Sequence, residues 1–234
     1  MIRVNGRLLL LALVTVVVTG CSSLGVQSTE QKQKQAKVEV SWPYAKDGIL
    51  LEVESSADLN HHANQSHAVV LGVIQLDDEK SFPKMLTDTT AVVDLLTTGK
   101  LSAGVLQMDR YVVNPGERHV VNIDRVQNTR FVGLLAGYYE FEPARAARYF
   151  RIPLNLQSSG LVIKDYKAEP SVLALRLVLG SQRIVNAVSL THDPDRSPTK
   201  ELLPTNNPPA EISVSPEGSN QTAPYSGSLI KLGR

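Results

Sequence analysis

The chain has 234 residues, a formal net charge of +1 at neutral pH and a single cysteine, Cys21. This length suits one sizeable domain with flanking segments, and a near-neutral charge without a basic block argues against a nucleic-acid-binding protein. A lone cysteine excludes an intramolecular disulfide, so a hydrophobic core must stabilise the fold. The composition allows one, because 42% of the residues are hydrophobic.

The N-terminus has the organisation of a secretory signal. Arg3 and Arg7 give a positive start, and residues 8–18 form an uncharged apolar run. This run has the length of a signal-peptide core and is shorter than the roughly 20 apolar residues that a transmembrane helix needs. We therefore predict a signal peptide over residues 1–20.

The signal ends in Val18-Thr19-Gly20-Cys21, which matches a bacterial lipobox. Small residues expose the bond before the cysteine to a signal peptidase, and the thiol of Cys21 can carry a diacylglycerol. The alternative is an ordinary secretory signal followed by an incidental cysteine. Ser22 stands where an aspartate would favour the inner membrane, so the pattern indicates a lipoprotein of the outer membrane, facing the periplasm.

Residues 21–45 are expected to link this lipid to the folded domain. The stretch from Gln27 to Gln35 is polar and predicts a flexible leash. Alternating residues over 37–44 suggest a short leading strand at its end.

Residues 46–191 show the pattern of a mainly β domain with one helical insertion. Asp88 can cap a helix whose apolar residues recur at helical spacing, and Gly99 is placed to end it. Pro115 and Gly116 have the spacing of a type II turn, and they predict a hairpin. Short strands with regular turns predict a two-sheet β-sandwich. The strands are expected at 49–53, 68–76, 105–113, 119–123, 131–139, 149–154, 161–166, 172–179 and 183–190.

Residues 192–234 differ from the rest of the chain. They are rich in proline, serine, asparagine and threonine, and this composition predicts a disordered tail.

No catalytic constellation stands out. The chain lacks a Gly-x-Ser-x-Gly elbow, a phosphate-binding glycine loop and a thiol other than Cys21, so we expect no enzyme and no cofactor. His61, His62 and His67 share one polar loop, but their spacing matches no recognised zinc pattern. Solvated loop histidines are the commoner arrangement, and we predict no metal site.

Several short motifs occur in the order found in a known family, and together they resemble the type VI secretion lipoprotein family, TssJ. The lipobox and polar leash come first, followed by Asp58-Leu59-Asn60, Val73-Ile74-Gln75-Leu76, Ser81-Phe82, Leu95-Leu96, Val113-Asn114-Pro115-Gly116-Glu117, Val132-Gly133-Leu134-Leu135-Ala136-Gly137-Tyr138-Tyr139 and Phe150-Arg151.

The resemblance implies a transthyretin-like β-sandwich with a small helical insertion and a non-enzymatic role as a structural tether. In the family this lipoprotein docks the periplasmic part of the inner-membrane protein TssM, which is itself joined to TssL. The contact is made by the loop between the first two core strands. Mapped onto this chain, the partner-binding residues are Asp58, Leu59, Asn60, His61, His62, Ala63, Asn64, Gln65 and Ser66.

Two other functions fit the sequence. The Pro-rich tail is compatible with a peptidoglycan- or carbohydrate-binding periplasmic lipoprotein, because such tails can thread through the cell wall. The histidine loop is compatible with a periplasmic metal carrier.

Overall fold

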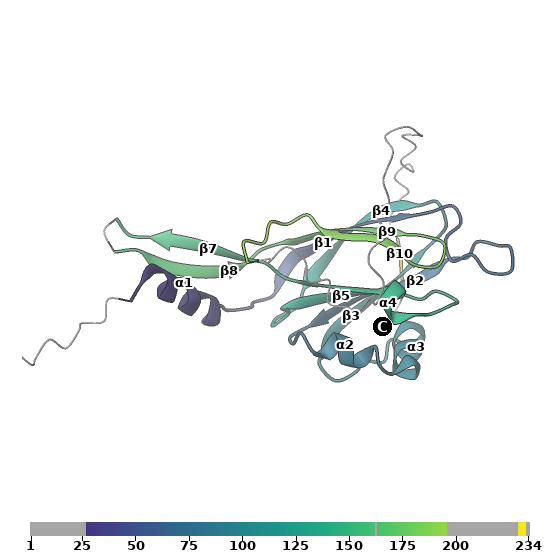
Figure 1. Ribbon diagram of the computed structural model, residues 1–234, viewed down its shortest axis with the longest axis horizontal. Coiled ribbons are helices and arrows are strands. Elements are labelled where there is room, and N and C mark those ends of the chain that lie inside the picture. The colour runs from purple at the N-terminus through teal and green to yellow at the C-terminus, as the bar shows by residue number, and fades with distance from the viewer. Residues whose placement is uncertain (1–26, 162, 196–228, 233–234) are drawn as a thin grey trace, which may run out of the picture.

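The structure is a computed structural model that describes residues 27–161, 163–195 and 229–232. Two β-sheets face each other, and a long hairpin extends from one end of the pair (Figure 1). This arrangement confirms the predicted mainly β, two-sheet sandwich. The first sheet contains, in spatial order, β10 (Ile184–Ser189), β9 (Leu173–Leu179), β1 (Ala45–Ser55) and β4 (Arg118–Arg125).

The second sheet is built around a strand that is buried on both faces. In spatial order it contains β11 (Ile230–Leu232), β3 (Val105–Val113), β2 (Val69–Leu76), β5 (Phe131–Ala136) and β6 (Ala147–Arg151). The projecting hairpin is a separate pair, β7 (Leu154–Ser159) and β8 (Asp165–Pro170). The helices are α1 (Thr29–Val38), α2 (Ser81–Met85), α3 (Thr89–Thr98) and α4 (Pro143–Ala146).

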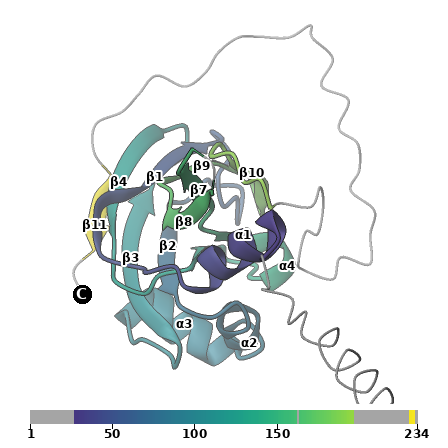
Figure 2. The same cartoon turned by 90° about the vertical axis from the view of Figure 1, so that its left-hand side faces the viewer.

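The central position of β2 in its sheet explains why the sequence of this strand is almost entirely apolar. Leu71 and Val73 belong to the main core between the two sheets. Ile74 and Leu76 belong to a second cluster on the outer face, where α2 and α3 pack (Figures 1 and 2). Both faces are therefore covered, as expected for a central strand.

The helical insertion forms where the sequence predicts it. The side chain of Asp88 accepts a hydrogen bond from the backbone N–H of Ala91 at 3.1 Å, and Gly99 ends α3 with a φ of 76°. Gly133 lets the helices approach the sheet closely, because a Cβ there would lie 2.4 Å from the ring of Phe82. The turn between β3 and β4 has a φ of 72° at Gly116, in agreement with the predicted type II turn.

Residues 27–38 are more ordered than the sequence indicates. Part of the expected leash forms α1, which begins at a capping box made by Ser28 and Gln31. Residues 39–44 contain no strand, so the predicted leading strand over 37–44 is wrong. Trp42, within that stretch, is nevertheless buried in the main core.

The β7–β8 region also differs from the sequence prediction. One strand was expected over 149–154 and another over 161–166, whereas β6 and β7 are separate and β8 begins at Asp165. Leu161 and Ile163 lie in the hairpin turn and are exposed. An apolar run therefore suggested a strand at a place where Leu161 and Ile163 face solvent.

Most of the predicted disordered tail lies outside the described residues. Its described C-terminal part is not disordered, because Leu229 is buried and β11 pairs antiparallel with β3. Across the described ranges of the chain, no helix combines the length and apolar character needed to cross a membrane.

Candidate functional site

The loop between β1 and β2, residues 56–68, projects from one end of the sandwich. It lies at the opposite end of the long axis from α1 and the β7–β8 hairpin (Figure 1, blue loop on the right). The candidate partner-binding residues of the sequence analysis all fall in this loop.

Two buried residues hold the base of the loop. Leu59 is fully buried in the main core. Asn60 is also buried; its amide nitrogen donates to the carbonyl of Ala68 at 3.1 Å, and its amide oxygen accepts from the backbone N–H of Tyr139 at 2.9 Å. Asn60 adopts a φ of 49°, a left-handed conformation that asparagine tolerates better than most residues. These contacts fix where the exposed part of the loop leaves the sandwich.

The outer part of the loop is a tight turn. The backbone groups of His62 and Gln65 exchange two hydrogen bonds, at 2.9 and 3.0 Å. The two residues between them, Ala63 and Asn64, have φ values of 49° and 60°, as a type I′ turn requires. The outer part of the loop therefore has a regular, hydrogen-bonded turn conformation before any partner binds.

Tyr139, just beyond β5, supports this turn from the side. Its ring stacks on the ring of His62 with centroids 4.7 Å apart and meets the ring of His67 edge-on at 4.9 Å. The side chain of Tyr139 is still 59% exposed. The three rings thus form a partly exposed aromatic cluster. The sequence does not reveal this role of Tyr139, because residues 131–139 are predicted to form one strand, whereas β5 ends at Ala136.

The turn between β9 and β10 lies beside the same loop. The backbone N–H of His61 donates to the carbonyl of Ser181 at 3.0 Å. The end of the sandwich therefore combines the β1–β2 loop, Tyr139 and the Gly180-Ser181 turn.

The structure brings the predicted residues together but gives them two different roles. Leu59 and Asn60 are buried and anchor the loop. The side chains that face solvent are those of Asp58, His61, His62, Ala63, Asn64, Gln65 and Ser66.

The chemistry of this surface suits binding rather than catalysis. It offers amides, imidazoles and an exposed tyrosine, and aromatic residues of this kind are frequent at the energetic centres of protein interfaces. Within the residues that the structure describes, no group of three or more histidine, cysteine, aspartate or glutamate side chains could hold a metal ion.

Glu52, a charged residue of the first sheet, has two structural partners. Glu52 on β1 accepts a hydrogen bond from Nε of Arg118 at 2.8 Å and one from Nε of Arg176 at 2.9 Å. Burial of Glu52 opposes ionisation, but these two guanidinium groups outweigh burial and hold the pKa of the carboxyl below its ordinary value. The carboxylate therefore links β1 to both neighbouring strands.

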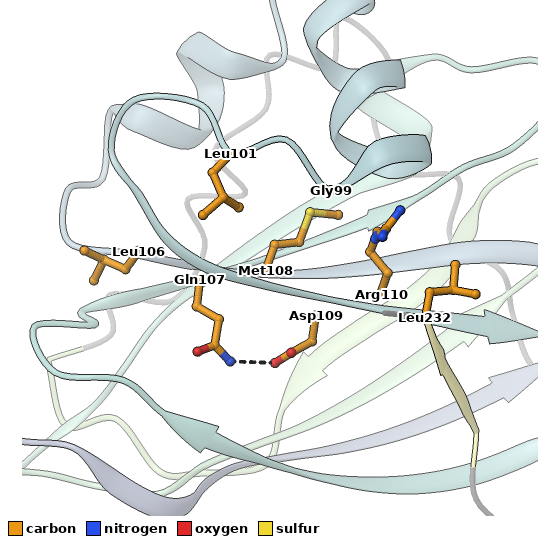
Figure 3. Close-up of a pocket in the computed structure, with 8 residues that line it drawn as sticks. All are labelled: Gly99, Leu101, Leu106, Gln107, Met108, Asp109, Arg110 and Leu232. Carbon is orange, nitrogen blue, oxygen red and sulfur yellow. Dashed lines mark hydrogen bonds between the residues drawn. The ribbon is translucent and has the colours of Figure 1, made fainter. Parts of the chain in front are cut away.

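A small cavity of about 140 Å³ lies between β3 and the end of α3 (Figure 3). Its polar groups are engaged within the protein. Arg110 donates to the carbonyls of Leu96 and Thr97 at 3.2 and 2.6 Å, and Gln107 donates to Asp109 at 2.9 Å. Ligand sites usually measure about 300–1,000 Å³, so this cavity is a packing feature rather than a candidate active site.

A β-sandwich that presents an ordered, partly aromatic loop has the architecture of a binding domain. The sequence model of the family described as "Type VI secretion lipoprotein, VasD, EvfM, TssJ, VC_A0113" matches residues 47–168, more than half of the chain. The chain therefore belongs to the type VI secretion lipoprotein family, whose members are structural lipoproteins and not enzymes.

Solved structures of type VI secretion proteins are similar to this chain. The lipoprotein TssJ1 from Pseudomonas aeruginosa is 20% identical, with a TM-score of 0.45 over 64% of this chain and 98% of that one. Lip from Serratia marcescens, a membrane-bound component of the type VI secretion system, is 16% identical, with a TM-score of 0.44 over 61% and 98%. A structure described as the TssM C-terminal domain from EAEC is 17% identical, with a TM-score of 0.43 over 62% and 98%. No curated protein sequence matches the chain.

Proposed function

We propose that this lipoprotein is a structural tether of the type VI secretion membrane complex. A lipid on Cys21 holds it in the outer membrane, and its β1–β2 loop docks the periplasmic part of a TssM-like protein, through which it is joined indirectly to TssL. The loop carries the proposal, because it is held rigidly at its base and exposed at its tip.

Two observations support the lipid anchor. The chain belongs to a lipoprotein family, and its single cysteine, Cys21, lies in the lipobox. Cys21 lies outside the described residues. Two or three acyl chains bind a membrane far more firmly than one, because each buried methylene contributes about 0.8 kcal/mol.

Pre-organisation supports the docking role. A loop that is ordered before binding loses little conformational entropy when a partner binds, so more of the contact energy appears as affinity. Asn60 and the type I′ turn provide that order, and Tyr139 supplies an exposed aromatic side chain beside the turn.

Replacing Tyr139 by alanine tests the docking surface. Removing an aromatic residue from the energetic centre of an interface costs about 2 kcal/mol or more, so the dissociation constant for a periplasmic TssM fragment should rise about thirtyfold or more. Isothermal titration calorimetry measures the constant, and circular dichroism verifies that the sandwich remains folded.

Val120→Ala is the matched control. Val120 on β4 has a similarly exposed apolar side chain, at 52%, but lies outside the loop cluster. Its variant should bind as the unmodified protein does. An affinity that is unchanged in Tyr139→Ala would move the interface away from this end of the sandwich.

A further inference from the structure

The tip of the β7–β8 hairpin is an apolar surface that the sandwich does not use. Leu161 is fully exposed and Ile163 is 70% exposed. The ladder that carries them runs from Leu154 opposite Pro170 to Ser159 opposite Asp165, so the tip stands well away from the core (Figure 1, left). Two neighbouring aliphatic side chains are thus held in solvent on a regular β-hairpin.

Helix α1 places this tip close to the start of the folded chain. Both views show α1 beside the hairpin (Figures 1 and 2). The ammonium group of Lys32, in the first turns of α1, lies 3.2 Å from the carbonyl of Lys164 and 3.5 Å from the carboxylate of Asp165. The hydrogen-bonded partner of α1 therefore lies immediately beside the apolar tip.

The covalent chain then limits the distance from this point to the lipid. Ser28 caps α1, and Cys21 lies seven residues earlier. Seven residues span at most about 24 Å when fully extended. A lipid on Cys21 thus keeps the start of α1 within that distance of the membrane, and the hairpin lies beside α1.

The residue types at the tip suit a lipid interface. Leu161 and Ile163 are followed directly by Lys164, which is also exposed. Aliphatic side chains can enter the acyl boundary while a lysine ammonium group remains among phosphate headgroups. A protein partner would need a larger patch, because stable interfaces bury about 1,000 Å² or more.

We propose that the β7–β8 tip inserts into the interface of the membrane that holds the lipid, giving the protein a second attachment point. This proposal rests on the proposed anchor at Cys21. Tethering makes the second contact intramolecular, so a weak insertion suffices. With the hairpin end held at the membrane, the β1–β2 loop at the opposite end of the long axis faces away from it.

Site-specific fluorescence on the full lipidated chain tests the proposal. The lipid occupies the thiol of Cys21, so Ser159→Cys introduces the only free thiol, at the end of β7 next to the tip. The protein is reconstituted into vesicles of phosphatidylethanolamine with phosphatidylglycerol as the minor lipid, and the thiol is labelled with a polarity-sensitive dye. We expect blue-shifted emission and quenching by a nitroxide lipid. A label at Ser66→Cys, in the β1–β2 loop, should show neither.

Substitutions at the tip distinguish insertion of the hairpin into the membrane from a position that is only close to the membrane. In the Ser159→Cys background, Leu161→Ser with Ile163→Ser should reduce quenching to the level of the Ser66→Cys control. Val120→Ser, an equally polar change on β4, should leave quenching at the tip unchanged. Emission at position 159 that does not respond to the tip substitutions overturns the proposal.

Vesicle flotation of the same samples reports the lipid anchor independently. Protein that floats but shows no quenching at position 159 contradicts the hairpin contact and leaves the anchor intact. Protein that does not float contradicts the anchor itself, and the hairpin proposal fails with it.

Discussion

Asn60 shows how one buried side chain can position an exposed surface. Its amide joins the β1–β2 loop to the backbone of Tyr139, 79 residues later in the chain, and to Ala68 at the far side of the loop. Its backbone occupies the left-handed region, with a φ of 49°. The side chain is not available to a partner, so its contribution to docking is to hold the loop in place.

Replacing Asn60 by alanine should lower the free energy of unfolding by about 2–3 kcal/mol, because two hydrogen-bond partners lose their contacts and alanine disfavours a positive φ. Asn60→Gly is the matched control, since glycine accepts the backbone conformation but also lacks the amide. The glycine variant should be about 1 kcal/mol more stable than the alanine variant. Urea unfolding followed by fluorescence of the single tryptophan, Trp42, measures both. Equal stability of the two variants would show that alanine pays no free-energy cost for the positive φ at position 60.

The sequence indicates the position of the β1–β2 loop but not how its residues are arranged. The family resemblance predicts that residues 58–66 form the contact region. It could not show that Leu59 and Asn60 point inward, because both lie in a polar segment without strand or helix periodicity. Tyr139 was missed because its partners, His62 and His67, are remote in sequence and adjacent only after β2 and β5 pair.

Among the elements, the first sheet is joined across three strands by one carboxylate. Glu52 on β1 contacts Arg118 on β4 and Arg176 on β9. The strands also differ in direction, because β1 runs antiparallel to β4 and parallel to β9. The ion cluster thus spans both kinds of pairing at the centre of the sheet.

This cluster predicts a pH dependence of stability. The folded-state pKa of Glu52 lies below its ordinary value of about 4.3, so the folded state favours the ionised form. Its contribution is present above that ordinary pKa and is lost as the pH falls through the lower, folded-state pKa. Glu52→Gln should therefore lower the unfolding free energy by about 1–2 kcal/mol at neutral pH, and the difference should shrink in acid.

Urea unfolding at a series of pH values measures this effect. Glu140→Gln makes the same charge change at an exposed position and should leave the curve almost unaltered. A deficit in Glu52→Gln that is constant from neutral to acid pH would show that ionisation of Glu52 does not stabilise the sheet.

Local patterns predicted most elements but not their long-range partners. The capping residues Asp88 and Gly99 identified α3 because a helix end depends on adjacent residues. The short strand β11 was not predicted, since it is stabilised by pairing with β3 far away in the sequence. Helix α1 is polar and buries only Ala36, so its composition resembled a leash. The exposed tip of the β7–β8 hairpin was mistaken for a strand because apolar composition alone does not establish burial.

In the whole molecule, the proposed membrane-attachment region and the proposed partner-docking loop lie at opposite ends. Helix α1 and the β7–β8 hairpin form one end, and the β1–β2 loop with Tyr139 forms the other (Figure 1). Sites that are far apart and share no partners usually act additively. We therefore expect anchoring and docking to be separable, although secretion would need both at once.

Cys21→Ser tests this separation. The variant should be released from the outer membrane, because no thiol remains to carry the lipid, and secretion should be lost. Its affinity for a periplasmic TssM fragment in solution should equal that of the unmodified protein, since the loop does not depend on the anchor for its structure. Membrane fractionation, a secretion assay and calorimetry measure the three outcomes, with Ser22→Ala as the neighbouring control. Normal secretion by Cys21→Ser would contradict the tether, whereas a loss of TssM affinity would show that the two ends are coupled.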